Sequence, residues 1–340
     1  MGVTVSDLHL EFSGYGVAWN SKIKNNQMKF VDVKNCVIEN LGGTVIDVDK
    51  FTRAGNGVEL YDGGDNVTVS NNIFRNIYDV AFTCQGNNPG TWRNITISDN
   101  VITYCTQAIE FWNGSQTVGA GVYNLKFENN LCIKNGESWA SIGGTPRLAS
   151  TDVLIYGYTA EAWQFDVKNN TFYHSNADSG EVYYCHGNTV EKFIASMTSD
   201  NNYIYHLNDK SNIFVTDAQG PQKYQSLRYN IEEWKTFSKK DANSTFIAIE
   251  DKLDNYKAME DIAHTSQNYH EIAKAADDAG ITVKLIYDTE KAINPDLGEI
   301  PLKNDEPNKS SSLIYIIIAV AVVVVVVIVI VVVLVSKKKK

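Results

Sequence analysis

The chain has 340 residues, 44% of them hydrophobic, and a formal net charge of −10. Its last four residues are lysines, so the remainder carries 26 basic against 40 acidic side chains, a balance of −14. An acidic body of this kind repels phosphate backbones, which excludes nucleic acid as an expected partner. The five cysteines are scattered and form no Cys-x-x-Cys pair, so buried thiols are expected, with one disulfide left open.

The chain opens directly on an alternating run, Gly-Val-Thr-Val-Ser-Asp-Leu-His-Leu (2–10). This run has neither the basic start nor the apolar core of a secretory signal. Because an exported protein needs such a signal, we expect the signal and further repeats to precede this sequence.

A short phrase recurs along residues 1–250: alternating apolar residues, an Asn-Asn or Asp-Asn pair, then a second brief apolar run. Clear copies are Lys-Phe-Val-Asp-Val-Lys-Asn-Cys-Val-Ile (29–38), Asn-Val-Thr-Val-Ser-Asn-Asn-Ile-Phe (66–74), Asn-Ile-Thr-Ile-Ser-Asp-Asn-Val-Ile (94–102) and Asn-Leu-Lys-Phe-Glu-Asn-Asn-Leu-Cys-Ile (124–133), with looser ones at 164–172 and 197–205. The second asparagine of each pair is taken as Asn35, Asn72, Asn100, Asn130, Asn170 and Asn202. A fixed phrase at variable spacing indicates coils of constant section that carry loops of different length.

The phrase has a physical explanation. Period-two alternation places side chains such as Val67 and Val69 on one face of a strand. Asparagine tolerates left-handed backbone angles and suits a corner, so Asn72, Asn100 and Asn130 are expected to stack, each amide bonding to the next coil. A third short strand is predicted after each corner, at Val80–Cys84, Ala108–Trp112 and Trp139–Ile142. Three strands per turn predict an all-β fold, a right-handed parallel β-helix over residues 1–250.

Residues from about 28 to 250 resemble right-handed parallel β-helix proteins of the pectate-lyase-like superfamily. The resemblance rests on the runs Gly55–Leu60, Asp79–Gly86 and Ala108–Asn113, and on a closing segment from Ser226 to Trp234 followed by Asp241, Asn243 and Ser244. It implies a fold that both enzymes and adhesins use. The calcium aspartates and the arginine base of pectate lyases have no residue-by-residue match here, so calcium stays open as a cofactor and no metal ligands are assigned.

Candidate site residues come from side chains that point out of the coils. Alternation turns Ile109 and Phe111 inward, which leaves Glu110 and Trp112 on the outer face. Coils stack about 4.8 Å apart, so carboxylates one or two coils apart lie roughly 5–10 Å from each other, as glycosidases require. We predict Glu110 and Asp79 as an acid/base pair that Glu59 assists.

The predicted substrate contacts surround these carboxylates. Trp112 and Trp139 would offer flat faces to a sugar ring, Tyr61 and Gln85 lie beside them, and Arg147 would hold an acidic sugar. His174 and His186 are further candidates for a base near a later coil. For each of these residues, a solvated or loop-capping role is the competing interpretation.

The pattern changes after the repeats. Residues 251–293 are predicted as an α/β appendage that covers the last coil: a helix over Tyr256–Ala279 with Ile262, Ile272, Ala273 and Ala276 on one face, Gly280 after its end, and a strand over Ile281–Tyr287. Residues 294–312, rich in proline and serine, are predicted as a polar stalk.

Residues 313–335 contain no charge and are dominated by valine and isoleucine. As a helix, 23 residues rise roughly 34 Å, enough to span a membrane, and residues 336–340 form a basic tail that should stay in the cytoplasm. The prediction is a single-pass protein with its N-terminal region outside the cell. A tail exchanged for a lipid anchor is the alternative.

The leading hypothesis is therefore a membrane-anchored, extracellular polysaccharide hydrolase or lyase. The alternative is a non-catalytic adhesin or glycan-binding presenter, and a weaker third option is a structural envelope protein. An enzyme should gather its carboxylates in a site with a raised carboxyl pKa, whereas an adhesin should disperse them around an aromatic patch.

Overall fold

The structure, a computed structural model, describes residues 2–20, 29–42, 44–47, 52–86, 91–113, 121–141, 151–155, 163–176, 180–187, 189–217 and 224–285. Arg147, the predicted stalk, the predicted membrane span and the basic tail lie outside the described residues. By their contacts, residues up to Ile293 form one compact unit and residues from Asn294 onward a second. Among the described residues, no helix combines the length and apolar composition needed to cross a membrane.

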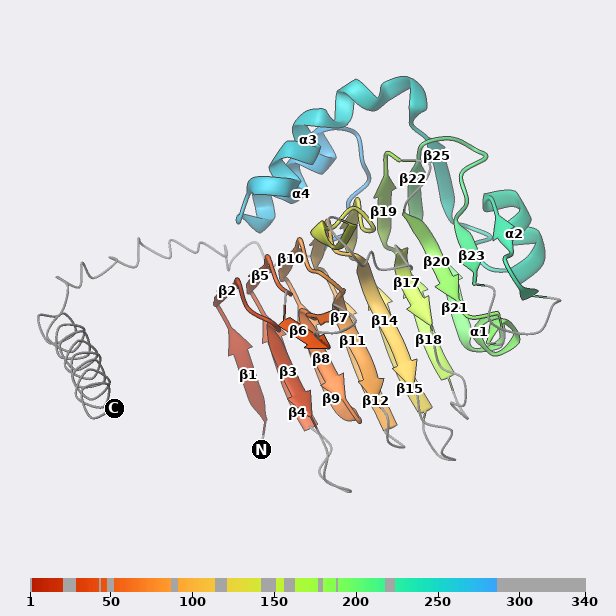
Figure 1. Ribbon diagram of the computed structural model, residues 1–340. Helices are drawn as coiled ribbons and strands as arrows, with labels where there is room; N and C mark the ends of the chain where they lie inside the picture. The colour runs from red at the N-terminus through yellow and green to blue at the C-terminus, as the bar shows by residue number, and fades with distance from the viewer. Residues whose placement is uncertain are drawn as a thin grey trace, which may run out of the picture. The chain divides into compact units, whose positions relative to one another are not determined.

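Three sheets, whose strands pair in parallel with one exception, form the walls of a solenoid (Figure 1). Sheet A contains β1 (Val3–Ser6), β4 (Lys29–Lys34), β9 (Gly64–Ser70), β12 (Thr91–Ser98), β15 (Gly121–Glu128), β18 (Trp163–Lys168) and β21 (Met197–Asp200). Sheet B contains β2 (His9–Glu11), β5 (Val37–Glu39), β10 (Ile73–Arg75), β13 (Val101–Thr103), β16 (Leu131–Ile133), β19 (Thr171–His174), β22 (Tyr203–His206) and β25 (Thr245–Ala248). Sheet C contains β3 (Val17–Asn20), β8 (Val58–Tyr61), β11 (Val80–Gly86), β14 (Gln107–Asn113), β17 (Thr151–Ile155), β20 (Glu181–Cys185), β23 (Phe214–Thr216) and, antiparallel to β23, β24 (Arg228–Tyr229).

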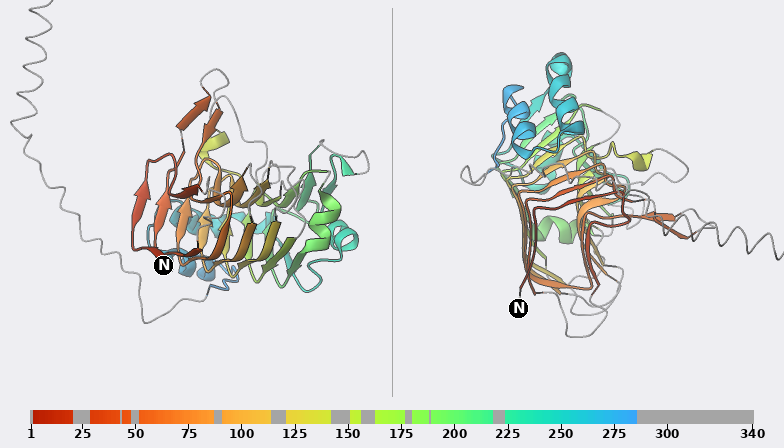
Figure 2. Two further views of the ribbon diagram at one scale, coloured as in Figure 1. Left: turned by 90° about the horizontal axis from the view of Figure 1, so that it is seen from below. Right: turned by 90° about the vertical axis from the view of Figure 1, so that its left-hand side faces the viewer.

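Each turn takes one strand from sheet A, one from sheet B and one from sheet C, and successive turns pair in register. Seen along the solenoid, the coils superpose (Figure 2). The predicted parallel β-helix is confirmed. One antiparallel hairpin, β6 (Thr44–Asp47) and β7 (Thr52–Ala54), is inserted between β5 and β8.

The corner between sheets A and B explains the repeated phrase. The first residue of each pair takes the left-handed conformation, as Asn71 (φ 55°) and Asn129 (φ 58°) do. The second residue is buried and bonds along the solenoid: Oδ1 of Asn100 accepts from the backbone N–H of Asn72 at 3.0 Å and from its side-chain amide at 3.0 Å. The same bonds join Asn100 to Asn130, Asn130 to Asn170 and Asn170 to Asn202. The predicted asparagine stack is therefore confirmed.

Two details of the predicted repeat are wrong. Asn35 is the left-handed corner residue (φ 56°), and Cys36 takes the ladder position, its backbone N–H donating to Asn72 Oδ1 at 2.9 Å. Residues Trp139–Ser141 form a 3-10 helix, η1, instead of a third strand. The third strand of that coil is β17, because the connection after sheet B is longer here than in the two preceding coils.

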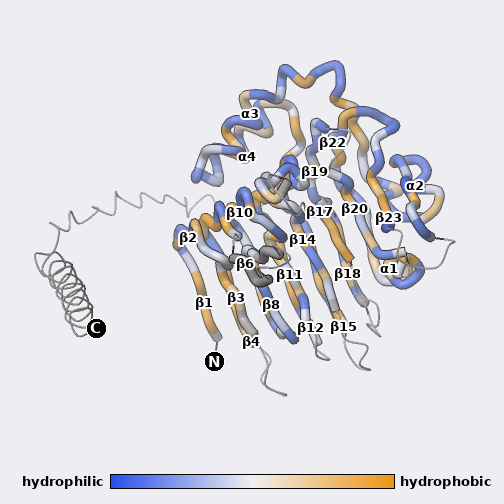
Figure 3. The backbone as a smooth tube through the Cα atoms, in the orientation of Figure 1, coloured by the Kyte–Doolittle hydropathy of each residue, from blue (hydrophilic) through white to orange (hydrophobic). Residues whose placement is uncertain are grey.

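The interior is filled by inward side chains of all three sheets. Hydrophobic residues recur along the strands, for example on β1 and β18 (Figure 3). At the end of the solenoid, α1 (Val190–Ser196) and α2 (Ile231–Ser238) contribute Phe193 and Trp234 to this core. The Trp234 ring stacks on Phe214 with centroids 4.7 Å apart, and its indole N–H donates to Asp241 at 2.9 Å. The segment expected to close the domain therefore does so, through α2.

A helical hairpin covers the outer face of sheet B instead of the last coil. It consists of α3 (Leu253–Thr265) and α4 (Tyr269–Asp278), preceded by a 3-10 turn, η3 (Glu250–Lys252). Residues of both helices share a core with outward side chains of β5, β10, β13, β16, β19 and β22 (Figure 2). The single predicted helix is thus two helices, and Gly280 (φ 82°) follows the second as expected. A strand was predicted over residues 281–287. Residues 281–285, the part that the structure describes, join no sheet, so the prediction is wrong for them.

Candidate functional site

The outer face of sheet C carries a row of side chains at one register position of successive coils, here called the carboxylate row. Glu59 of β8 pairs with Thr83 of β11, and Thr83 pairs with Glu110 of β14. Because neighbouring strands lie about 4.8 Å apart, the Cα atoms of the two glutamates are separated by about 10 Å. The row continues over later coils as Leu154, Tyr184 and Val215, which pack together.

Both glutamates are engaged by neighbouring side chains. The Thr83 hydroxyl donates to Oε2 of Glu110 at 3.0 Å. Oε2 of Glu59 accepts from the Gln85 amide at 2.8 Å and from the Asn56 amide at 2.5 Å. Glu59 and Glu110 are each only 8% exposed, so the interpretation of solvated surface carboxylates does not apply to them.

Burial raises the pKa of both carboxyl groups. For Glu110 burial raises the pKa to about 7, the Thr83 hydrogen bond opposes the rise, and the negative charge of Glu59 adds to it. Burial also raises the pKa of Glu59, while hydrogen bonds from Asn56 and Gln85 lower it. Burial therefore favours the protonated form of both carboxyl groups, while the two amide donors on Glu59 favour its ionised form.

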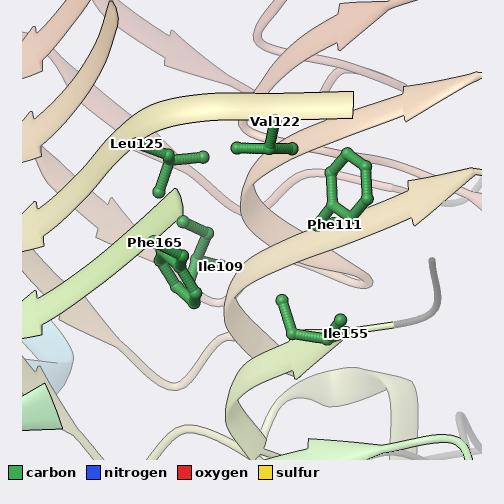
Figure 4. A pocket seen from close by; sticks show the side chains of 6 residues that line it. All are labelled: Ile109, Phe111, Val122, Leu125, Ile155 and Phe165. Carbon is green, nitrogen blue, oxygen red and sulfur yellow. The ribbon is translucent and has the colours of Figure 1, made fainter. Parts of the chain in front are cut away.

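The inner face of β14, opposite Glu110, packs against apolar side chains. Six apolar side chains surround a void of about 10 Å³ there, too small and too apolar for an ordered water (Figure 4). They are Ile109, Phe111, Val122, Leu125, Ile155 and Phe165. This packing holds β14 in the wall of the solenoid, and with it the outward position of Glu110.

The structure does not bring Asp79 to Glu110. Asp79 precedes β11 by one residue and lies four residues before Thr83, about 13 Å along the strand. Its backbone carbonyl accepts from the N–H of Gln107 at 3.0 Å, and it is 6% exposed. Glu59, predicted only to assist, is the carboxylate that shares the row with Glu110.

Of the predicted substrate contacts, three lie next to the carboxylate row. Tyr61, Gln85 and Trp112 form the adjacent outward row, and all three are half-buried. Trp139 lies elsewhere: its ring packs on Tyr78 at 4.8 Å between centroids, and its indole N–H donates to the Leu41 carbonyl at 3.1 Å. Trp139 therefore belongs to the B–C corner near Asp79.

Two functional contacts escaped prediction from the sequence. Thr83 lies between the two glutamates, and aligning the third-strand phrases of successive coils would have placed it there. Asn56 donates a hydrogen bond to Glu59, which lies three residues later in the same Gly55–Leu60 run. Its own Oδ1 atom is buried and accepts no hydrogen bond within the described part of the chain.

The two candidate histidines form different pairs. Nε2 of His174 lies 2.7 Å from Oδ2 of Asp152, and both side chains are fully buried, so this pair cannot reach a substrate. His186 follows β20 directly and pairs with Asp217, which follows β23 directly. Both come one position after the paired Cys185 and Thr216, so by register they continue the line of Gln85 and Trp112, two and three coils beyond Trp112.

Comparison with known proteins agrees with this architecture. The family model described as "Right handed beta helix region" matches residues 4–132. The chain is also similar to the serine protease pet autotransporter of Escherichia coli O44:H18 (strain 042 / EAEC), with 22% identity over 246 residues, 58% of this chain and 19% of that protein. The chain thus spans about a fifth of that relative's length, and no solved structure matches it. Together with the stacked parallel strands, the family match identifies the chain as a right-handed parallel β-helix protein.

Proposed function

We propose that this protein is an extracellular, cell-surface polysaccharide hydrolase in which Glu110 is the general acid and Glu59 the general base. The observation that carries the proposal is the carboxylate row: two buried glutamates on alternate coils, one with a pKa of about 7. Glycosidases need one carboxyl that keeps its proton near neutral pH and a second that is ionised.

The spacing and surroundings suit an inverting mechanism. Inverting glycosidases hold their carboxyl groups roughly 6.5–9.5 Å apart to leave room for a water molecule, and two coil steps provide a separation of that order. The free Oδ1 atom of Asn56 lies beside Glu59 and would accept a hydrogen bond from that water. In this scheme Glu110 protonates the leaving oxygen while Glu59 removes a proton from the attacking water, so charge balances across the reaction.

The neighbouring row would bind the sugar. Tyr61 and Trp112 provide partly exposed aromatic rings on either side of Gln85, and aromatic faces pack against the apolar faces of pyranose rings. A saccharide chain running across the strands would meet successive coils in turn. Asp79, Trp139 and Arg147 remain candidates for more distant substrate contacts, and calcium remains open as a cofactor.

The cellular location is part of the same proposal. The apolar run at 313–335 would anchor the protein, with the solenoid outside the cell and residues 336–340 in the cytoplasm. Similarity to an autotransporter supports a surface location. The protease activity named for that relative is not transferred, because the chain is 22% identical to it and matches 19% of its length.

The test is release of reducing ends from a polysaccharide panel. Glu110→Gln and Glu59→Gln should each lower release at least about 100-fold, the usual contribution of a general acid or base. Glu128→Gln is the matched control: this glutamate lies on sheet A, and its variant should retain wild-type release. Undiminished release by Glu110→Gln would remove it from the mechanism.

The second candidate, a non-catalytic glycan-binding surface protein, is favoured by one observation. The carboxylates of Glu59 and Glu110 are already bonded to Asn56, Gln85 and Thr83, as structural groups would be. This candidate predicts binding without release, unchanged by Glu110→Gln and weakened by Trp112→Ala. Binding of an array polysaccharide that the wild-type protein never cleaves would favour it.

A further inference from the structure

A second cluster of ligating side chains lies on the outer face of sheet B. His9 and Glu11 come from β2 and Glu39 from β5, with Glu11 and Glu39 paired in register. Nε2 of His9 is 2.7 Å from Oε1 of Glu39 and 3.6 Å from Oε2 of Glu11. One donor atom from each of the three residues lies within 4.8 Å of the other two.

The two carboxylates of the cluster differ in their partners. Glu39 is buried and its Oε2 atom accepts from Arg75 Nε at 2.8 Å and Nη2 at 2.5 Å, which compensates one carboxylate. The second carboxylate, on Glu11, has only the imidazole of His9 within ion-pair distance among the described contacts.

We propose that His9, Glu11 and Glu39 bind a divalent transition-metal ion, with zinc as the best match. Imidazole and carboxylate donors suit this ion, and a tetrahedral zinc with ligands at about 2.0–2.1 Å keeps donor atoms about 3.3 Å apart. The His9–Glu11 separation already fits. The His9–Glu39 separation has to open by about 0.6 Å as the metal replaces the proton between them.

The surroundings provide the support that metal ligands need. Arg75 holds the other oxygen of Glu39, as outer partners do for ligating carboxylates. The Gln267 amide nitrogen donates to Oε1 of Glu39 at 2.7 Å and lies 3.5 Å from Nε2 of His9, so it supports the Glu39 ligand and leaves the fourth position to a water. Glu11 is 38% exposed and leaves a route for the ion.

The site would fasten the helical hairpin to the first two coils. Gln267 lies in the loop between α3 and α4, and Arg75 Nη1 donates to the Ser266 carbonyl of the same loop at 2.5 Å. A metal held by β2 and β5 would fix Glu39, to which Gln267 and Arg75 of this contact are bonded, and so add to that clamp. The ion is thus structural, independent of the carboxylate row, and should stabilise the folded chain in proportion to its binding.

The test uses the full chain, stripped with chelator and titrated with zinc chloride at pH 7.5 by calorimetry. We expect one ion per chain and a rise of several degrees in melting temperature at saturating zinc. His9→Gln and Glu11→Gln should each weaken binding at least tenfold. His264→Gln, at an exposed histidine of α3, is the matched control and should bind like wild type.

His9→Gln keeps a side chain that can donate to Glu39, so its melting temperature without metal should equal that of the stripped wild type. The alternative is a metal-free cluster in which His9 only forms a hydrogen bond with Glu39. Absence of binding at 100-fold excess zinc over micromolar protein, or binding that survives both site variants, would overturn the metal site.

Discussion

The asparagine ladder allows a sharp test of how the coils are held together. Asn100 lies in its middle and is completely buried. Its Oδ1 atom accepts from the backbone N–H and the side-chain amide of Asn72, and its amide donates to the carbonyl of Val69 at 2.9 Å and to Asn130 Oδ1 at 3.1 Å. The amide also donates to the carbonyl of Ser98 at 2.9 Å, and replacement by alanine removes all five bonds.

The cost follows from the groups left behind. The Asn72 backbone N–H and the Val69 carbonyl lose this partner in the interior, and an unsatisfied buried polar group costs about 1–3 kcal/mol. Asn100→Ala should therefore lower the free energy of unfolding by about 2–6 kcal/mol, a large part of the 5–15 kcal/mol typical of a folded domain. Coupling between neighbouring coils should fall too, so the unfolding transition should broaden.

The assay is urea unfolding followed by circular dichroism, with Asn255→Ala as the control. Asn255 is an exposed residue of α3, and its replacement should change stability by less than about 0.5 kcal/mol. If Asn100→Ala loses less than about 1 kcal/mol relative to wild type, the ladder does not couple the coils as inferred.

Three further predictions follow from single features. Trp234→Ala should cost about 3–5 kcal/mol in urea unfolding, because it removes a buried ring that stacks on Phe214; an intact midpoint would show that α2 does not close the core. Burial holds the Glu110 pKa at about 7 against about 4.5 when unfolded, so wild-type stability should fall between pH 4.5 and 7 as the unfolded carboxyl ionises first. Glu110→Gln should remove about 2–4 kcal/mol of that loss, and identical pH profiles for both proteins would contradict it. All five cysteines are free and buried, and burial raises the Cys105 pKa to about 12. A thiol reagent at pH 8 should therefore label five cysteines, and only after unfolding. Labelling of only three cysteines would reveal a disulfide.

The sequence predicted the solenoid because its corners are determined locally. A left-handed asparagine followed by a buried one leaves a short, repeated signature. The position of the buried residue was predicted wrongly in one coil, where Cys36 replaces the ladder asparagine. The third strands were harder to predict because the connections before sheet C vary in length. Trp139 was placed on a strand for that reason, although it belongs to a 3-10 turn within one such connection.

The sequence also indicated that the outer face of sheet B, on which α3 and α4 pack, is covered. The short strands of sheet B, such as Val37–Glu39, Val101–Thr103 and Leu131–Ile133, have little polar alternation, and all of their residues are buried. Continuous apolar runs indicate strands covered on both faces. These strands therefore indicated that another part of the chain covers sheet B, but only the three-dimensional structure shows that α3 and α4 do so.

The composition of the carboxylate row argues that its glutamates serve a purpose beyond folding. Stacking in register favours asparagine, which donates and accepts at once, but it disfavours carboxylates, since two charges 5 Å apart repel by about 3 kcal/mol at an effective dielectric constant of 20. Thr83 separates Glu59 from Glu110 and roughly halves that repulsion. Farther along, the same row is filled by Leu154, Tyr184 and Val215, so apolar residues satisfy this position where only packing is needed. Two buried glutamates with raised pKa values therefore occupy positions where apolar side chains would give a more stable fold. Proteins retain such local conflicts at functional sites.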